Sequence, residues 1–300
     1  MSAAPRILIV GAAGQVGMEL QRSFAGMGEI VAANRETLDL AQPGEIRALI
    51  RQVQPEILLN AAAYTAVDRA EAEPELAMAV NARAPGVLAE EASRCGALLV
   101  HYSTDYVFDG EKQGPWTEED TPNPLNVYGR TKLAGERAIA QAGGSYLIFR
   151  TSWVYGAHGS NFLLTMLRLA QTRERISVVD DQRGSPTTSI ELANATREIV
   201  KGVRSGKFGT QENWAGLYHM TCAGETTWCG FAQAIFDRAG KLLAGKAPAV
   251  VPIASAEYPT PAKRPRNSVL SNAKLHKSFG VQLALWQAAL DTVVRELVEP

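Results

Sequence analysis

The stretch ILIVGAAGQVGMELQRSF, residues 7–24, constrains the fold more than any other part of the chain. An apolar β-branched run, three glycines spaced three apart and an amphipathic run predict a strand, a tight turn and a helix. In such a turn Gly11 permits the change of direction, Gly14 lets the backbone approach a phosphate, and Gly17 lets the helix pack closely on its strand. The helix N-terminus presents free N–H groups to an anion. The spacing is GxxGxxG and not the more usual GxGxxG. A simple turn between strand and helix therefore remains an alternative to a nucleotide-binding loop.

The same alternation continues through the first half of the chain. Strands are expected at 6–11, 29–33, 56–60, 97–103 and 145–150, and helices at 15–26, 43–53, 74–95 and 125–142. The strand sequences are apolar almost throughout, as expected where helices cover both faces of a parallel sheet. Residues 1–155 therefore predict a doubly wound α/β domain of the Rossmann type, which binds NAD(P).

The pattern becomes less regular beyond residue 155. Strands are expected at 175–181, 216–221 and 247–253, helices at 160–172, 189–202, 226–240 and 284–298, and a Pro-rich loop at 258–267. Since no long linker separates the two halves, residues 156–300 predict a smaller α/β substrate lobe interleaved with the first domain, with some segments returning to it.

Charge and cysteine content exclude several function classes. Thirty basic and thirty-one acidic residues leave a formal charge of −1, so no global field favours nucleic acid or an anionic membrane. The start of the chain lacks the pattern of a signal peptide, and no run reaches the roughly 18 apolar residues of a membrane span. Cys95, Cys222 and Cys229 are an odd, scattered set, which fits a reducing compartment, and a cytoplasmic protein is expected.

The segment VAANRETLDL follows the second expected strand, where an acidic residue usually binds the ribose of NAD. Here Asn34 is neutral and Arg35 could meet a 2′-phosphate, which favours NADPH while NADH stays possible. A solvated surface role for Arg35 is the alternative. Asp39 and Leu40 are candidates for the adenine pocket.

The sequence YGRTKLAGERAIA places Tyr128 and Lys132 four residues apart, on one face of a predicted helix. A phenol has a pKa of about 10, and a nearby ammonium favours its ionised form, so the pair can exchange a proton with a substrate oxygen. HYSTDYVFDG places Ser103 and Thr104 at the carboxyl end of the fourth strand, where α/β sheets bind ligands. Tyr-x-x-x-Lys alone also arises on helix surfaces, but with the glycine loop and Thr104 it predicts catalysis.

These segments together resemble a known family. The glycine loop, LNAAAYTAVD at 59–68, YSTDYVFDG at 102–110, NVYGRTK at 126–132 and FRTSWVYG at 149–156 are similar to the extended short-chain dehydrogenases/reductases. Within that superfamily the chain resembles the dTDP-4-dehydrorhamnose reductase family, and the likeness extends through DQRGSPT to YPTPAKRPRNSVL.

The resemblance implies hydride transfer from NADPH or NADH to C4 of dTDP-4-dehydro-L-rhamnose, a step of dTDP-rhamnose biosynthesis. Tyr128 would protonate the C4 oxygen, Lys132 would hold the nicotinamide ribose, and Thr104 would polarise the ketone. The further residues that it implies along the cofactor are Gly14, Gln15, Val16, Ala63, Tyr64 and Thr65. Tyr64 could equally be a packing residue.

For the sugar nucleotide, the resemblance implies contacts from Asp105 and from Trp153, whose indole packs on the deoxysugar in this family. A core aromatic is the other reading of Trp153. The dTDP phosphates need their own site, for which Gln182, Arg264 and Arg266 are candidates, because guanidinium groups match phosphate oxygens. Exposed loop arginines are also often only solvated.

Metal ligands are not assigned. His101, His158, His219 and His276 are dispersed, without the spacing of a catalytic zinc site. Some family members bind Mg²⁺ through glutamates at a dimer contact, for which Glu191, Glu296 and Glu299 are conceivable; Mg²⁺ and a homodimer are left open.

Two rival functions are considered. A nucleotide-sugar epimerase or dehydratase would share the fold, but a dehydratase commonly needs an Asp-Glu pair beside the threonine, and here Asp105 is followed by Tyr106. A non-catalytic NADP-binding regulatory subunit, like that of methionine adenosyltransferase, could also carry this fold. The presence of Thr104, Tyr128 and Lys132 favours an enzyme.

Overall fold

The computed structural model describes residues 4–240, 242–243 and 247–299. Its largest sheet has six parallel strands in the order β10-β5-β4-β3-β1-β2. In chain order these are β1 (Arg6–Val10), β2 (Glu29–Ala33), β3 (Ile57–Asn60), β4 (Leu98–Thr104), β5 (Tyr146–Thr151) and β10 (Gly216–His219). The strand order reverses between β1 and β3, so the carboxyl ends of these two strands flank the crevice where such sheets bind ligands.

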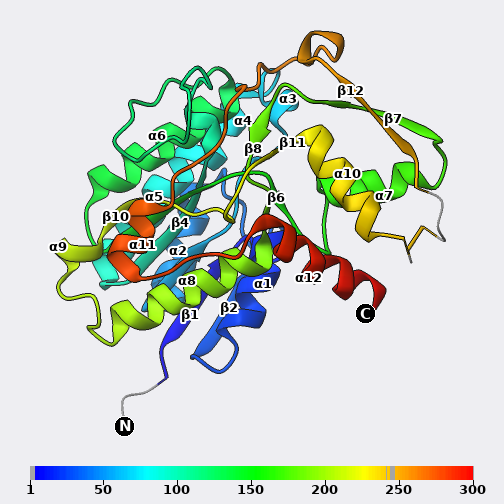
Figure 1. Ribbon diagram of the computed structural model, residues 1–300. Helices are drawn as coiled ribbons and strands as arrows, with labels where there is room; N and C mark the ends of the chain where they lie inside the picture. Colours follow the sequence, from blue (N-terminus) through cyan, green and yellow to red (C-terminus); the bar gives the residue numbers. More distant parts are fainter. Residues whose placement is uncertain (1–3, 241, 244–246, 300) are drawn as a thin grey trace.

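Helices cover both faces of this sheet (Figure 1). One face packs against α1 (Gln15–Phe24), α8 (Ser189–Arg204) and α11 (Ala273–Phe279), and the other against α2 (Pro43–Val53), α5 (Ala84–Cys95) and α6 (Val127–Ala142). Alternation within β1 explains the two cores: Ile7 and Ile9 enter the first, whereas Leu8 and Val10 enter the second. The first domain therefore buries its central strands from both sides.

A second lobe lies beside the carboxyl edge of the sheet (Figure 1). Its core, which includes Phe231, Ile235 and Leu290, joins α7 (Phe162–Ala170), α10 (Trp228–Arg238) and α12 (Trp286–Val298). Three two-stranded sheets complete it: β7 (Arg175–Val179) with β12 (Ala249–Ile253), β8 (Arg183–Gly184) with β11 (Thr226–Thr227), and β6 (Val154–Tyr155) with β9 (Thr187–Thr188). The remaining short elements are α3 (Val67–Ala70), α4 (Pro74–Met78), the π-helix η1 (Ala79–Arg83), the 3₁₀ turns η2 (Asp105–Val107) and η3 (Ser255–Glu257), and α9 (Gln211–Trp214).

The second half of the chain returns to the first domain several times. Strand β10 adds the sixth strand beside β5, α8 packs against α1, and α11 packs against β10. The lobes are thus joined by several crossings of the chain.

The predicted doubly wound parallel sheet is confirmed, and most element positions agree within a few residues. The single helix expected over 74–95 is instead α4, the π-helix η1 and α5. Pro85, in the first turn of α5, has no N–H to bond the carbonyl of Asn81 one turn back. Gly135 of α6 lies directly against that carbonyl, and any side chain there would collide with it. The short strands β6, β8, β9 and β11 were not predicted, because two residues carry no periodicity.

Within the described residues, no helix is both long enough and apolar enough to cross a membrane.

Candidate active site

Thr104 and Tyr128 lie together at the carboxyl end of β4. Thr104 is the last residue of that strand, and Tyr128 is the second residue of α6. The Thr104 hydroxyl donates to Asp105 Oδ1 at 2.9 Å, accepts from the Tyr106 N–H at 3.1 Å, and lies close enough to the Tyr128 phenol to act on its pKa. Ser103 instead donates to Glu136 Oε1 at 2.5 Å, away from this group. The strand end therefore offers one hydroxyl and one phenol to a ligand oxygen.

Burial raises the pKa of Tyr128 to about 12, although the nearby Thr104 hydroxyl opposes this shift. The phenol thus keeps its proton at neutral pH and can donate it. Burial lowers the pKa of Lys132 to about 8. Lys132 Nζ donates to the Tyr102 carbonyl at 2.6 Å and lies 3.2 Å from His101 Nε2, so it is anchored by the backbone of β4.

Side chains that the sequence reading did not single out fix the start of α6. Asn126 caps the helix, accepting from the Gly129 N–H at 2.8 Å, and its amide donates to the Lys263 carbonyl at 2.8 Å. The Val127 N–H donates to Glu71 Oε1 at 2.7 Å. An Asn directly before a helical pattern is a recognisable N-cap signal, so Asn126 was detectable from sequence. Its link to the Pro-rich loop was not.

The glycine loop has the geometry of a backbone cradle. Gly11 adopts a φ of +81°, and a Cβ there would come within 2.6 Å of the Ala62 backbone nitrogen. A Cβ on Gly17 would collide with the Gly11 carbonyl and lie 2.8 Å from the Ala12 Cα. Gly14 caps α1 without a side-chain hydrogen bond. The first-turn N–H groups of the helix, from Gln15 and Val16 onward, are therefore directed at the crevice between β1 and β3.

The loop after β3, with Ala63, Tyr64 and Thr65, is held in place by a buried asparagine. Asn81 accepts from the Tyr64 N–H at 2.7 Å and donates to the Tyr64 carbonyl at 3.1 Å. The Tyr64 phenol donates to Glu73 Oε2 at 2.5 Å, and Tyr64 packs against Ala70 and Ala77. The Tyr64 ring thus has a packing role in the fold, while its backbone borders the crevice.

The segment after β2 forms a turn at the same end of the sheet. Asn34 Oδ1 accepts from the Glu36 N–H at 2.9 Å, and Asp39 Oδ1 accepts from the Ala41 N–H at 2.8 Å. Leu40 packs on the α2 side of the core. Arg35 is exposed, has no ion pair among the described residues, and lies near enough to Tyr64 to act on the pKa of its phenol. A free guanidinium therefore stands at the edge of the crevice.

The three residues suggested for the dTDP phosphates differ in their surroundings. Arg264 donates to both oxygens of Asp68, at 2.7 and 3.2 Å, so its guanidinium already pairs with a carboxylate. Gln182 is buried and donates to Ser255 Oγ at 2.9 Å. Arg266 is exposed. Of the two arginines, Arg266 is the one with its side chain open to solvent.

Trp153 follows β5, and its neighbour Ser152 contacts Asp105 at the end of β4. The hydroxyl of Ser152, the preceding residue, donates to Asp105 Oδ2 at 3.4 Å. Trp153 has a φ of +49°, in the left-handed region that side chains other than glycine rarely adopt. Its indole stacks on Trp228, with ring centroids 3.6 Å apart and planes within 9°.

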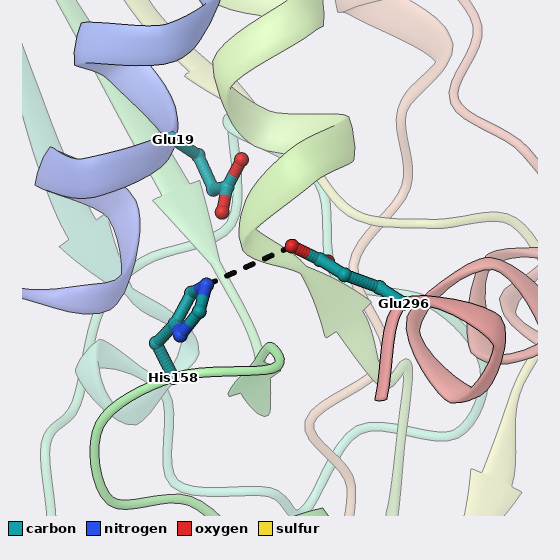
Figure 2. A group of neighbouring side chains, drawn as sticks. All are labelled: Glu19, His158 and Glu296. Atoms are coloured by element: carbon teal, nitrogen blue, oxygen red, sulfur yellow. Dashed lines mark ion pairs between the residues drawn. The ribbon is translucent and has the colours of Figure 1, made fainter. Parts of the chain in front are cut away.

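A separate polar group joins α1 and α12 (Figure 2). Glu19, His158 and Glu296 each offer a ligand atom within 4.8 Å of the others, and His158 Nε2 lies 3.6 Å from Glu296 Oε1. Arg22 supplies a cation to the same group, 3.0 Å from Glu19 and 2.8 Å from Glu296. Glu191, the other carboxylate considered, accepts from the Ala284 N–H elsewhere. Carboxylates and imidazoles are ligands for divalent cations, but here the Arg22 guanidinium already lies against all three side chains, 3.1 Å from His158 Nε2.

Comparisons with known proteins cover the chain almost completely. A family model described as RmlD substrate binding domain matches residues 5–299. A dTDP-4-dehydrorhamnose reductase of Burkholderia thailandensis is 47% identical over 98% of this chain and 99% of its own length. The enzyme of the same name from Escherichia coli K12 is 43% identical over 97% of each. A crystal structure of dTDP-4-dehydrorhamnose reductase from Bacillus anthracis in complex with NADP superposes with a TM-score of 0.89, at 34% identity over 97% of this chain and 99% of the other.

Proposed function

The chain belongs to the RmlD substrate binding domain family, and from this premise we propose that it reduces the C4 ketone of dTDP-4-dehydro-L-rhamnose to dTDP-L-rhamnose with NADPH. The observation that carries the proposal is that the Thr104 hydroxyl, the Tyr128 phenol and the glycine loop lie at the same carboxyl edge of the parallel sheet. NADH is the second cofactor to test.

The residues around the crevice fit a dinucleotide. Gly11 and Gly17 lack Cβ atoms that would collide with the neighbouring backbone, and the uncapped N-terminus of α1 offers N–H groups to a pyrophosphate. Arg35 is free to meet a 2′-phosphate, which favours NADPH over NADH. When bound, NADPH supplies the hydride that C4 of the sugar accepts.

The chain's own residues then handle the oxygen and the proton. When the substrate binds, the Thr104 hydroxyl turns from Asp105 to the C4 oxygen, donates a hydrogen bond there and withdraws electron density from the ketone. Tyr128 transfers its phenol proton to the same oxygen as the hydride arrives, which completes the alcohol. Lys132, as a cation close to the crevice, stabilises the phenolate that Tyr128 leaves behind and binds the nicotinamide ribose.

Substrate contacts follow from the same assignment. Asp105, which accepts from the Thr104 hydroxyl before the substrate binds, faces the sugar, and Trp153 borders it. Gln182, Arg264 and Arg266 line the route of the dTDP phosphates, which requires Arg264 to exchange Asp68 for phosphate oxygens. In this assignment residues 1–155 hold the cofactor and residues 156–300 mainly the sugar nucleotide.

The proposal also covers location and assembly. We place the protein in the cytoplasm, since Cys95, Cys222 and Cys229 are all free thiols, as expected in a reducing compartment. Because some members of the family that the chain resembles bind Mg²⁺ through glutamates at a dimer contact, we propose a homodimer that uses the face with Glu19 and Glu296. Sedimentation with and without Mg²⁺ tests this part, and a monomer under both conditions would remove it.

The direct test is turnover of purified protein with NADPH and a panel of 4-keto-6-deoxy sugar nucleotides, followed by identification of the C4 configuration of the product. Tyr128→Phe should lower kcat at least about 100-fold while NADPH affinity stays within about twofold, because only the proton donor is lost. Tyr146→Phe, in strand β5 and packed in the core, is the matched control and should keep normal turnover. Normal turnover by Tyr128→Phe would refute the assignment of the proton donor. Absence of reduction by the wild type, with cofactor bound, would instead favour the regulatory-subunit alternative.

A further inference from the structure

The Trp153 indole is covered by protein on both faces. Trp228 covers one face, with centroids 3.6 Å apart and an interplanar angle of 9°. A Cβ built on Gly184 would lie 2.7 Å from Trp153 Cζ2 and 2.7 Å from Nε1, and closer still to Cε2, the atom bonded to both. A Cβ outside the ring edge would be nearer to Nε1 and Cζ2 than to Cε2. Because this Cβ is nearest to Cε2, it lies over the face of the ring. Since Trp228 and Gly184 cannot occupy the same space, they cover opposite faces.

The two sides of this sandwich form one structural unit. Gly184 is in β8, which pairs antiparallel with β11, and β11 leads directly into Trp228 at the start of α10. An ion pair between Arg183 and Glu225 reinforces this pairing. Phe162 of α7 packs on Trp228, with centroids 4.7 Å apart. The paired strands β8 and β11 of the second lobe therefore place Gly184 and Trp228 on the two faces of the Trp153 ring.

The backbone of Trp153 needs such support. A left-handed φ of +49° is unfavourable for any residue that carries a Cβ. Such a backbone conformation persists only where surrounding contacts hold it in place. The Trp153 carbonyl accepts from the Thr187 N–H at 3.3 Å, which fixes the main chain on the side of β9. The ring itself is fixed by Gly184 and Trp228.

We propose that Gly184 and Trp228 are positioning residues which clamp Trp153, so that the sugar nucleotide meets the edge of the indole and not its face. This inference rests on the proposed function and changes the expected contact, because a face already stacked on Trp228 has no room for a hexose. The edge carries Nε1–H, a hydrogen-bond donor suited to a sugar hydroxyl or a phosphate oxygen. Through Trp153, the second lobe thus fixes the position of the indole at the sugar site without contacting Tyr128.

The test combines kinetics with circular dichroism, since two stacked indoles produce an exciton couplet in the far ultraviolet. Trp228→Ala should lose the couplet and raise KM for the sugar nucleotide about tenfold, with KM for NADPH unchanged within about twofold. Trp228→Phe keeps an aromatic ring on Trp153 and should restore most of the sugar KM without the couplet. Gly184→Ala tests the other face by pushing on the ring, and should raise the same KM even if Trp228→Ala folds poorly. Trp286→Phe, buried in α12, is the control and should keep both the couplet and the KM.

The contrary arrangement gives opposite results. If the hexose stacks on the Trp153 face, it must displace Trp228, so Trp228→Ala would lower KM for the sugar nucleotide. In that case adding dTDP-L-rhamnose to the NADPH-bound wild type, a pair that cannot react, would abolish the couplet. The clamp requires the couplet to persist. Wild-type turnover is measured first: its absence refutes the proposed function, whereas normal turnover with an unchanged or lowered KM in Trp228→Ala refutes only the clamp.

Discussion

Replacing Asp105 with asparagine should stabilise the protein at neutral pH and change its stability little near pH 4, while lowering catalysis. The Asp105 carboxyl is 3% exposed and accepts from the hydroxyls of Thr104 and Ser152. Burial raises its pKa from 3.8 to about 6, against the hydrogen bonds that favour the ionised form, including one from Ser268. At neutral pH the ionised Asp105 carboxylate therefore destabilises the folded state.

The size and sign of the effect follow from that shift. A pKa change from 3.8 to about 6 corresponds to about 3 kcal/mol between the two protonation states. Because the folded state binds this proton more tightly than the unfolded state, the stability is fully present below pH 3.8 and is lost as the pH rises through about 6. Asparagine cannot ionise, so it avoids this loss. Weaker hydrogen bonds to the neutral amide offset part of the gain, which leaves about 1–3 kcal/mol.

Urea unfolding at about pH 4 and about pH 8 measures the difference. Asp105→Asn should raise the free energy of unfolding at the higher pH and match the wild type at the lower one. Asp237→Asn, on the exposed face of α10, is the control and should show no such pH dependence. The same change at both pH values, or a loss of stability at pH 8, would refute the reasoning. The variant should also lower kcat, because Asp105 holds the Thr104 hydroxyl.

Three further outcomes are expected. Turnover should decline as the pH rises through about 8, because Lys132 loses its charge there; a kcat that stays constant to about pH 10 would contradict this assignment. Glu136→Gln should cost about 3–5 kcal/mol in denaturant unfolding, because it leaves the buried guanidinium of Arg150, held at 2.6 and 2.8 Å, without its counter-charge. Gly17→Ala should weaken NADPH binding and lower the melting temperature, since its methyl group would collide with the Gly11 carbonyl; calorimetric binding at wild-type affinity would show that α1 can move without cost.

The sequence by itself determined the sheet, the glycine loop at its carboxyl edge and the helical face that Tyr128 and Lys132 share. Nearly continuous apolar runs specify strands buried on both faces, glycines at fixed spacing specify a loop without Cβ atoms, and four-residue spacing places Tyr128 and Lys132 on one helical face. These are local properties of the chain, so periodicity and residue type were sufficient. The division of residues 74–95 into three helical segments also has a cause in the sequence, Pro85, although the hydrophobic periodicity did not indicate it.

Only the tertiary structure decided the contacts between distant segments. The pairing of Arg264 with Asp68, the cap of Asn126 on the Pro-rich loop, the gathering of Glu19, His158 and Glu296, and the sandwich of Trp153 all join residues far apart in sequence. Strands of two residues, such as β8 and β11, bring such segments together but have no periodic signal. Their position depends on how the second lobe packs on the sheet, and that packing is set by the shapes of many side chains at once.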